Sequence, residues 1–144
     1  MKLVGKAIRR IVKASELNSD IGTRFYNALA PQGAAYPLAV GRVVGVTPVD
    51  SKAFPGGKFG RACTDTYMYR VTVYDHDAEN CAEIASRFRL VLDRPRPGDY
   101  GDGMQINLCR FMGAQEDAYT EDDGDLFAWT LDFEIRMDFS TDKV

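Results

Sequence analysis

Apolar and polar residues alternate almost without interruption from Leu126 to Phe139, near the end of the chain. The apolar residues that fall on one face are Phe127, Trp129, Leu131, Phe133, Ile135, Met137 and Phe139. The polar residues on the other face are Thr130, Asp132, Glu134, Arg136 and Asp138. A period of two with charges on one side predicts a strand of an antiparallel sheet that is covered on one face. The acids Asp132, Glu134 and Asp138 are expected either to pair across a subunit boundary or, more simply, to face water. We expect the rest of the chain to be organised around this strand.

Other segments show the same alternation. Arg24 to Leu29 is predicted to form a short strand, and Asp65 to Tyr74 a clear one with Tyr67, Tyr69, Val71 and Val73 inward. From Leu38 to Val46, larger residues alternate with Ala39, Gly41 and Gly45, which we expect on the outer face. Glycines there indicate that another element passes close by.

The last predicted pairing is a hairpin. Met104 to Leu108 alternates, and the phase breaks at Cys109 to Met112, as it does at a bulge. The turn Asp122-Asp123-Gly124-Asp125 contains an Asp-Gly pair between two alternating runs, which is a strong hairpin signal. We therefore expect the strand with Met104 to Leu108 to pair with the strand from Leu126 to Phe139.

Two segments have the apolar spacing of amphipathic helices. The first runs from Lys2 to Leu17, and its predicted stop signals are Asn18, Ser19, Asp20 and Gly22. Its outer stripe is Lys2, Lys6, Arg9 and Lys13, which fits either contact with phosphate or a membrane surface or, more simply, a solvated outer face.

The second helix is predicted from Ala78 to Leu92. Asp75 or Asp77 could cap its start, and Asp93-Arg94-Pro95 ends it. The prolines and glycines from Arg94 to Gly103 predict a surface loop. Together these patterns predict a single α+β domain over residues 1–144, with an antiparallel sheet, two amphipathic helices packed on one face and a long hairpin-like arm.

The arm is the segment from Thr47 to Ala62, which has two prolines, three glycines and no apolar period. A connection of this length within a domain is usually functional or disordered. Phosphate binding is a competing interpretation, but neither common glycine-rich phosphate motif is present. Aromatic and basic residues around a Pro-Gly-Gly turn favour an interface, and the predicted interface residues are Lys52, Phe54, Pro55, Lys58, Phe59 and Arg61.

Charge is spread unevenly over the 144 residues. The formal net charge is -3, which does not suggest a general nucleic-acid binder. Up to Lys13 there are five basic residues and no acid, whereas Glu116 to Val144 holds ten acids against Arg136 and Lys143. This asymmetry would steer like subunits together head to tail, although two solvated faces of different charge are the simpler reading.

The sequence lacks the usual signals of catalysis or metal binding. Cys63, Cys81 and Cys109 form no CxxC pair and are expected to be buried thiols in a reducing cytoplasm. Asp75 and Asp77 flank His76, the single histidine, but no nucleophile accompanies it in a known motif, so a structural or exposed role is expected. The acids Glu121 to Asp125 lack the spacing of a calcium loop. We therefore expect no enzyme activity, no cofactor and no metal, and no stretch predicts a signal peptide or a membrane span.

The order of the elements and several local stretches resemble the tail completion and tail terminator proteins of tailed bacteriophages. The resemblance covers most of the chain and rests on three stretches: Ala30 to Gly45, Tyr67 to Asp93 and Ile106 to Ile135. It implies a non-enzymatic virion protein of the head-tail junction, assembled in the host cytoplasm. Copies would form a ring, commonly a hexamer, that ends the tail tube. The implied partners are the tail tube protein and the head-tail connector or stopper protein, with DNA only as passing cargo and no membrane.

A second hypothesis belongs to another class. The chain would be a small intracellular α+β module that binds a ligand or regulates a partner, including as a dimer, with Tyr67, Tyr69 and His76 near a pocket. The mass of the assembled protein separates the two hypotheses.

Overall fold

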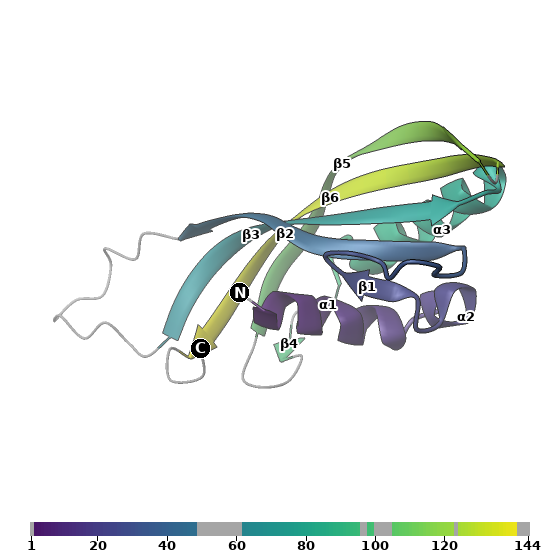
Figure 1. The fold of residues 1–144 in the computed structure, drawn as a ribbon. Coiled ribbons are helices and arrows are strands. Elements are labelled where there is room, and N and C mark those ends of the chain that lie inside the picture. Colours follow the sequence, from purple (N-terminus) through teal and green to yellow (C-terminus); the bar gives the residue numbers. More distant parts are fainter. Residues whose placement is uncertain (1, 49–61, 96–97, 100–104, 123, 141–144) are drawn as a thin grey trace, which may run out of the picture.

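The computed structural model describes residues 2–48, 62–95, 98–99, 105–122 and 124–140. Helices α1 and α3 pack against one face of a sheet whose strand order is β1-β2-β3-β6-β5-β4 (Figure 1). The α+β class is therefore confirmed. The helices in these ranges are α1 (Lys2–Lys13), α2 (Leu17–Ile21) and α3 (Ala78–Leu92). The strands are β1 (Phe25–Asn27), β2 (Leu38–Pro48), β3 (Ala62–Asp75), β4 (Gly98–Asp99), β5 (Gln105–Glu121) and β6 (Gly124–Ser140).

The sheet is mixed and not wholly antiparallel as the sequence suggested. β1 runs parallel to β2, while every other neighbouring pair is antiparallel. Residues 28–37 between β1 and β2 carry the chain back along the sheet, so β2 starts at the same end as β1. The hydrophobic period of a strand does not depend on the direction of its neighbour, so the sequence pattern could not distinguish the two cases.

The last strand lies at the centre of the sheet, as predicted. β6 pairs with β3 from Phe127 to Ser140, and on its other side it forms the predicted hairpin with β5, where Ile106 pairs with Met137. Leu131, Phe133, Ile135 and Met137 are buried on the helix-covered face. The side chain of Phe139 lies outside the described residues.

Toward the Gly124 end of β6 the burial differs from the expected alternation. Trp129 lies on the helix-covered face but is only partly buried. On the opposite, open face Leu126 and Ala128 are buried. Leu126 shares an apolar depression with Leu29 and Tyr36, residues of the connection between β1 and β2, so this connection covers part of the open face.

β5 is longer than the predicted segment, because it continues past Met112 to Glu121. Its register with β6 shifts between Phe111 and Gly113, within the predicted break, and again between Ile106 and Leu108. Bulges of this kind place one extra residue in a strand and increase its twist. Part of the predicted loop from Arg94 to Gly103 is also a strand, since Gly98 and Asp99 form β4 and pair with the start of β5.

The first helix is shorter than predicted. α1 ends at Lys13 and the chain turns before α2, so three helices are present in the described ranges where two were expected. The turn is held by Ser15, whose hydroxyl donates to the carbonyl of Val12 (2.6 Å) and accepts from the amide of Leu17 (3.2 Å). Such local bonds compete with helix continuation.

Asn18, Ser19 and Asp20 were predicted to end the first helix but instead belong to α2. Leu17 and Ile21 anchor α2 in the core. Gly22 ends α2 with a positive φ of 56°, a conformation that costs glycine little.

α3 has the predicted bounds. The Asp77 carboxylate caps its start by accepting from the amides of Glu79 and Asn80 (3.0 and 3.3 Å). Asp75 accepts from the side-chain amide of Asn80 (2.7 Å). At the other end, the Asp93 carboxylate accepts from the amide of Phe111 (3.0 Å), which ties the end of α3 to β5.

The faces of β2 are the reverse of the prediction before the register shift at Val44, because Ala39 and Gly41 face the core. After the shift, Gly45 pairs with Met68 and Val46 with Tyr67, so these two residues lie on the predicted faces, although Val44 and Val46 are exposed. A Cβ at Gly41 would lie 2.6 Å from Phe25 Cε1 and would also meet the hydroxyl of Tyr69, so these two rings need the space that glycine leaves. The register shift between Val43 and Gly45 then changes the phase of the strand.

The residues of the predicted arm interface, Lys52, Phe54, Pro55, Lys58, Phe59 and Arg61, lie outside the described residues. The strands on either side of them pair as an antiparallel hairpin, in which Pro48 pairs with Asp65. The segment therefore begins and ends at the same end of the sheet.

Gly41→Ala should destabilise the protein by about 1–3 kcal/mol, because the new methyl group overpacks the core against Tyr69 and Phe25. The matched control is Gly45→Ala in the same strand, where nothing lies within 4 Å of the new Cβ. Urea unfolding should lower the midpoint for Gly41→Ala and leave the control close to wild type. Equal midpoints for the two variants would show that this packing is wrong.

Candidate interaction surfaces

The centre of the open sheet face carries cross-strand ion pairs. Arg70 of β3 donates to Asp132 of β6 (2.8 Å), and Arg110 of β5 donates to Glu134 of β6 (2.9 Å). The expectation that Asp132 and Glu134 face water alone is therefore wrong, because register places an arginine beside each. The side chain of Asp138 lies outside the described residues. Half-exposed pairs contribute roughly 0–1 kcal/mol, so their clearer effect is to favour one register.

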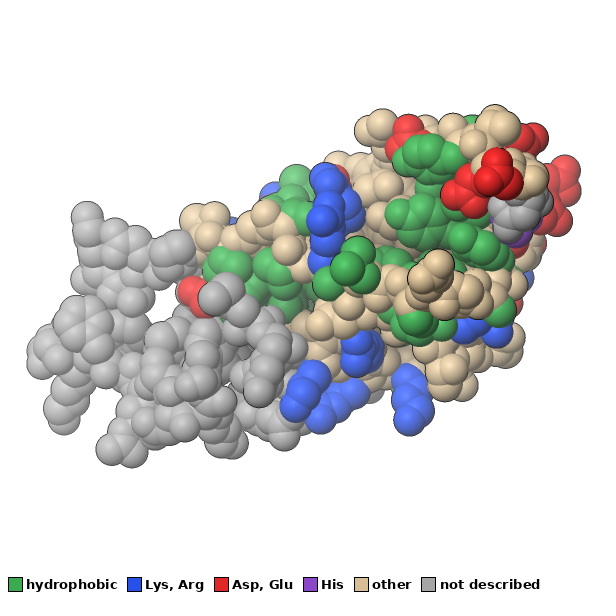
Figure 2. Space-filling view, viewed as in Figure 1, with side chains coloured by type: hydrophobic (Ala, Val, Ile, Leu, Met, Phe, Trp, Pro, Cys, Tyr) green, Lys and Arg blue, Asp and Glu red, His purple; other side chains and the backbone are tan. Residues whose placement is uncertain are grey.

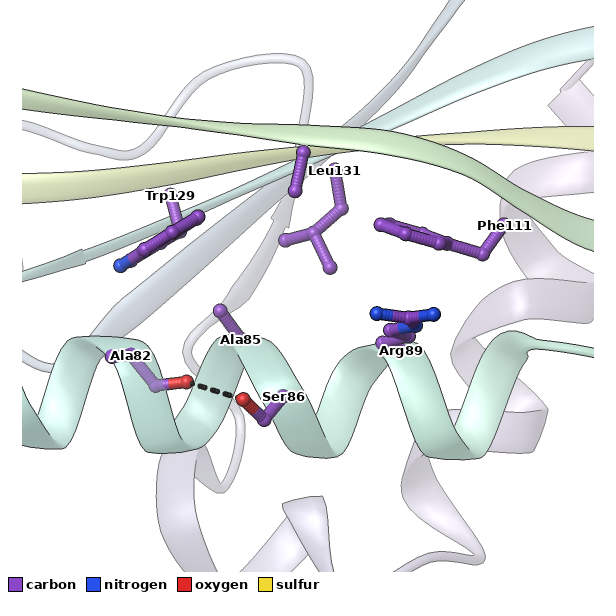
Figure 3. A pocket seen from close by; sticks show the side chains of 8 residues that line it. Ala82, Ala85, Ser86, Arg89, Phe111, Trp129 and Leu131 are labelled. Atoms are coloured by element: carbon purple, nitrogen blue, oxygen red, sulfur yellow. Dashed lines mark hydrogen bonds between the residues drawn. The ribbon is translucent and has the colours of Figure 1, made fainter.

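On the other face, an apolar groove lies between α3 and the β5–β6 hairpin. It has a volume of about 210 Å³ and is lined by Ala82, Ala85, Ser86, Arg89, Phe111, Ala114, Trp129 and Leu131. Figure 3 shows that Trp129, Leu131 and Phe111 extend from the strands toward the alanines of α3. Small side chains on the helix keep the groove open, so Trp129 and Phe111 are only partly covered, whereas Leu131 is buried.

Arg89 closes one end of this groove. Its guanidinium carbon lies 4.3 Å from the centre of the Phe111 ring, and the two planes stack (Figure 3). Phe111 in turn contacts Phe133 edge to face, with ring centres 5.8 Å apart. A stacked arginine keeps its charge at the rim while covering apolar surface.

Opposite charges gather on different parts of the surface. Acidic residues cluster around the tip of the β5–β6 hairpin, and basic residues line α1 and the region of β2 near it (Figure 2). The exposed acids of the hairpin are Glu116, Glu121, Asp122 and Asp125. The exposed basic residues of α1 are Lys6, Arg9, Arg10 and Lys13. The charge asymmetry of the sequence is thus an asymmetry of the surface.

Apolar side chains also gather on the open face beside the acidic tip (Figure 2). Leu29 is 82% exposed and Tyr119 is 49% exposed. Together with Val40 and Tyr74, these residues place uncovered apolar area next to the acids. Such a combination is common at sites of protein contact.

His76 lies at the end of β3 and is exposed. Its Nδ1 lies 2.8 Å from the carbonyl oxygen of Asp125, which can only accept, so Nδ1 carries the proton. Tyr36 packs edge-on against the imidazole, with ring centres 4.6 Å apart. These contacts give His76 a structural position between the β5–β6 turn and the connection that precedes β2.

Tyr67 and Tyr69 do not join His76 in a pocket. Each is 2% exposed within the core, in the middle part of β3 and away from its end at Asp75. Burial raises the pKa of Tyr69 to about 12 despite the nearby charge of Arg9. The depression beside His76 is instead lined by Tyr36 and other residues of the β1–β2 connection.

Several kinds of site are absent from the described ranges. No group of three or more histidine, cysteine or acidic side chains is placed to hold a metal ion in those ranges. None of the helices seen there is long and apolar enough to cross a membrane.

The sequence did not predict the groove or the hairpin edge. Phe111 fell within the predicted break in phase and Ala114 after it, where the pattern gave no strand. Ala114, Glu116 and Ala118 share one face of β5, but the charge on Glu116 leaves no apolar period that would have indicated a continued strand. The groove depends on packing between α3 and β6, which a single sequence does not specify.

The fold is similar to that of a known virion protein chain. The solved structure is described as "Virion of native gene transfer agent (GTA) particle", and the superposition has a TM-score of 0.64 and covers 91% of each chain. The identity is 14%, so the likeness is one of fold. No protein-family model matches the sequence. A search of curated proteins finds no match.

Cys81 and Cys109 should resist alkylation in the folded protein. Burial, together with Asp75 near Cys81 and Asp93 near Cys109, raises the pKa of Cys81 to about 11 and that of Cys109 to about 12. Both thiols therefore stay protonated at pH 8 and inaccessible to reagent. Mass mapping after iodoacetamide should find both unmodified at pH 8 and both modified in urea. Rapid labelling of either thiol without denaturant would contradict the packing.

Proposed function

We propose that this chain is a structural protein of a tailed-phage-like virion. In this proposal it acts at the head-tail junction, where copies form a ring, six in number by resemblance, that ends the tail tube. The partners would be the tail tube protein and the head-tail connector or stopper protein. The role is non-enzymatic, and DNA passes without being a substrate.

The observation that carries the proposal is the likeness of fold to a chain of a gene transfer agent virion, which extends over 91% of both chains. A likeness over nearly the whole chain favours a subunit built from the same single domain. The resemblance of Ala30 to Gly45 and of Ile106 to Ile135 to tail terminator proteins supports the more specific position in the particle.

The surface charges support association between copies. A ring requires heterologous contacts, in which one surface of a subunit meets a different surface of the next. The acidic hairpin tip and the basic helix α1 are different surfaces of opposite charge. Complementary charges of this kind increase the rate of encounter and disfavour wrong orientations.

The arm is proposed to supply further contacts. Phe54 and Phe59 would be the anchors and the basic residues a charged rim, because aromatic side chains contribute much of the energy at protein interfaces. The ends of this segment leave the sheet together at the end of the β2–β3 hairpin. The whole interface set is therefore expected to act from one end of the subunit.

The ligand-binding or regulatory module remains the alternative, and it has less support. It was based on a pocket shared by Tyr67, Tyr69 and His76, and the two tyrosines are buried in the core. A depression beside His76 is present, but its lining is a surface connection.

Replacing Phe54, Pro55, Gly56, Gly57 and Phe59 with serine should block ring formation and leave the melting temperature nearly unchanged. The physical reason is that the proposed anchors act between subunits and not within one. Sedimentation velocity should give a closed oligomer for wild type and a monomer for the variant. Leu90→Ser is the matched control, because Leu90 is exposed on α3, and it should assemble like wild type.

A loss of stability in this variant would contradict the prediction. If the two phenylalanines instead cover the sheet of their own subunit, the variant should lose several kcal/mol of stability, as after loss of buried aromatic side chains. A defined wild-type dimer would favour the alternative module.

A further inference from the structure

Two outer edges of the sheet have no partner strand within the described ranges. β1 pairs only with Ala39 to Gly41, so the edge of β2 from Arg42 to Thr47 is uncovered there. β4 pairs only with the start of β5. Further along β5, the Asp93 carboxylate accepts a hydrogen bond from the amide of Phe111, and the amide of Arg94 donates to the carbonyl of Cys109. Neither contact reaches Gly113 to Glu121, so this part of the β5 edge is uncovered in the described ranges. An uncovered edge is a template for pairing with another chain.

We propose that the β2 edge of one copy adds to the β5 edge of the next copy, so that the sheet continues from subunit to subunit. The contact joins Val43–Thr47 of one copy to the Gly113–Glu121 edge of the other. This inference rests on the proposed ring and identifies the contact that builds it. The partner is a second copy of this chain.

The strand directions fit such a contact. Three antiparallel steps, from β2 to β3, β6 and β5, make β5 antiparallel to β2. Register places Val43 level with Phe111, so the Val43–Thr47 edge and the Gly113–Glu121 edge lie at different heights along the strands. In a ring whose axis is inclined to the strands, rotation from copy to copy offsets neighbouring sheets along the strands, which brings these two stretches together without reversing the strand directions. The β2 edge of one copy therefore meets the β5 edge of the next in antiparallel orientation, and each copy uses two different surfaces.

The side chains of the two edges are complementary. Val43 to Thr47 contains no charge, and Val44 is 43% exposed. Val46 pairs with the core residue Tyr67, so it lies on the helix-covered side. A strand added to β5 would place such a side chain over the groove lined by Ala114 and Trp129 (Figure 3). Main-chain bonds with a pocket for alternate side chains characterise strand addition.

The charges beside the two edges are opposite. Arg42 is exposed on β2, and α1, which contacts β2, adds Lys6 and Arg9. The β5 edge carries exposed Glu116 and Glu121. A β2 edge is therefore attracted to a β5 edge, whereas two β5 edges repel each other. This complementarity selects a second copy in a head-to-tail orientation over a symmetric pair.

The test blocks one edge at a time. Val46→Lys introduces a charge into the β2 edge, and Ala114→Lys fills the groove beside β5 with a charge next to Arg89. Leu90→Lys adds the same charge on the outer side of α3 and is the matched control. Sedimentation velocity gives the oligomeric state over the soluble concentration range, and circular dichroism and melting confirm that each variant is folded.

Val46→Lys and Ala114→Lys should each be monomeric alone, while the Leu90→Lys control assembles like wild type. Mixed together, the two edge variants should form heterodimers and nothing larger, because only one pair of intact edges remains. The double variant should not pair with either single variant. These results support strand addition between unlike edges.

The outcomes that overturn the proposal are distinct. If both edge variants form the same ring as the wild-type protein, this contact is refuted and the proposed function still stands. A mixture that stays monomeric would show that the two blocked surfaces are not partners. Wild type that stays monomeric at every concentration would count against both the contact and a self-assembling ring.

Discussion

The pairing of β3 with β6 is the interaction on which the rest of the fold depends. It runs from Ala62 to Asp75 without a register shift, and it aligns Tyr69 with Phe133 and Val71 with Leu131 on the helix-covered face. Those side chains are fully or almost fully buried, and α3 packs against both strands. A one-residue slip would move all of them to the open face, so the register of these two strands is strongly specified. β2 and β5 are then added on either side of an already defined pair.

Elements whose apolar residues follow a strict period were predictable from the sequence, whereas features that depend on packing against neighbouring elements were not. The strands containing Tyr69 and Phe133, and the helix α3 with its Asp77 cap, agree with the prediction because local pattern and burial coincide there. The faces of the first part of β2, from Leu38 to Gly41, were assigned wrongly because side-chain size suggested that the larger residues go inward. Gly41 faces the core since Tyr69 and Phe25 already fill that space. Only the tertiary arrangement reveals this.

The candidate surfaces were predictable only in part. Charge asymmetry was visible in the sequence and survives as two separate surfaces. The groove beside Trp129 and the uncovered edge of β5 follow from the length of β5 and from the place where α3 packs, so no local motif indicates them. The bulge near Met112 explains why the edge of β5 was not predicted, because it interrupts the alternation just before this edge begins.

Within the described residues, a sheet with two unlike uncovered edges, separated charges and an apolar groove is suited to repeated contacts between copies. These features, together with the likeness of fold to a chain of a virion structure, are the basis of the proposed assembly role. The central claim of that proposal is that the chain belongs to the junction between head and tail. Gold labelling of a tagged chain in purified particles tests it most directly. The account predicts label at a single position, between head and tail. Label spread over the capsid or along the tail, or absent from particles, would contradict it.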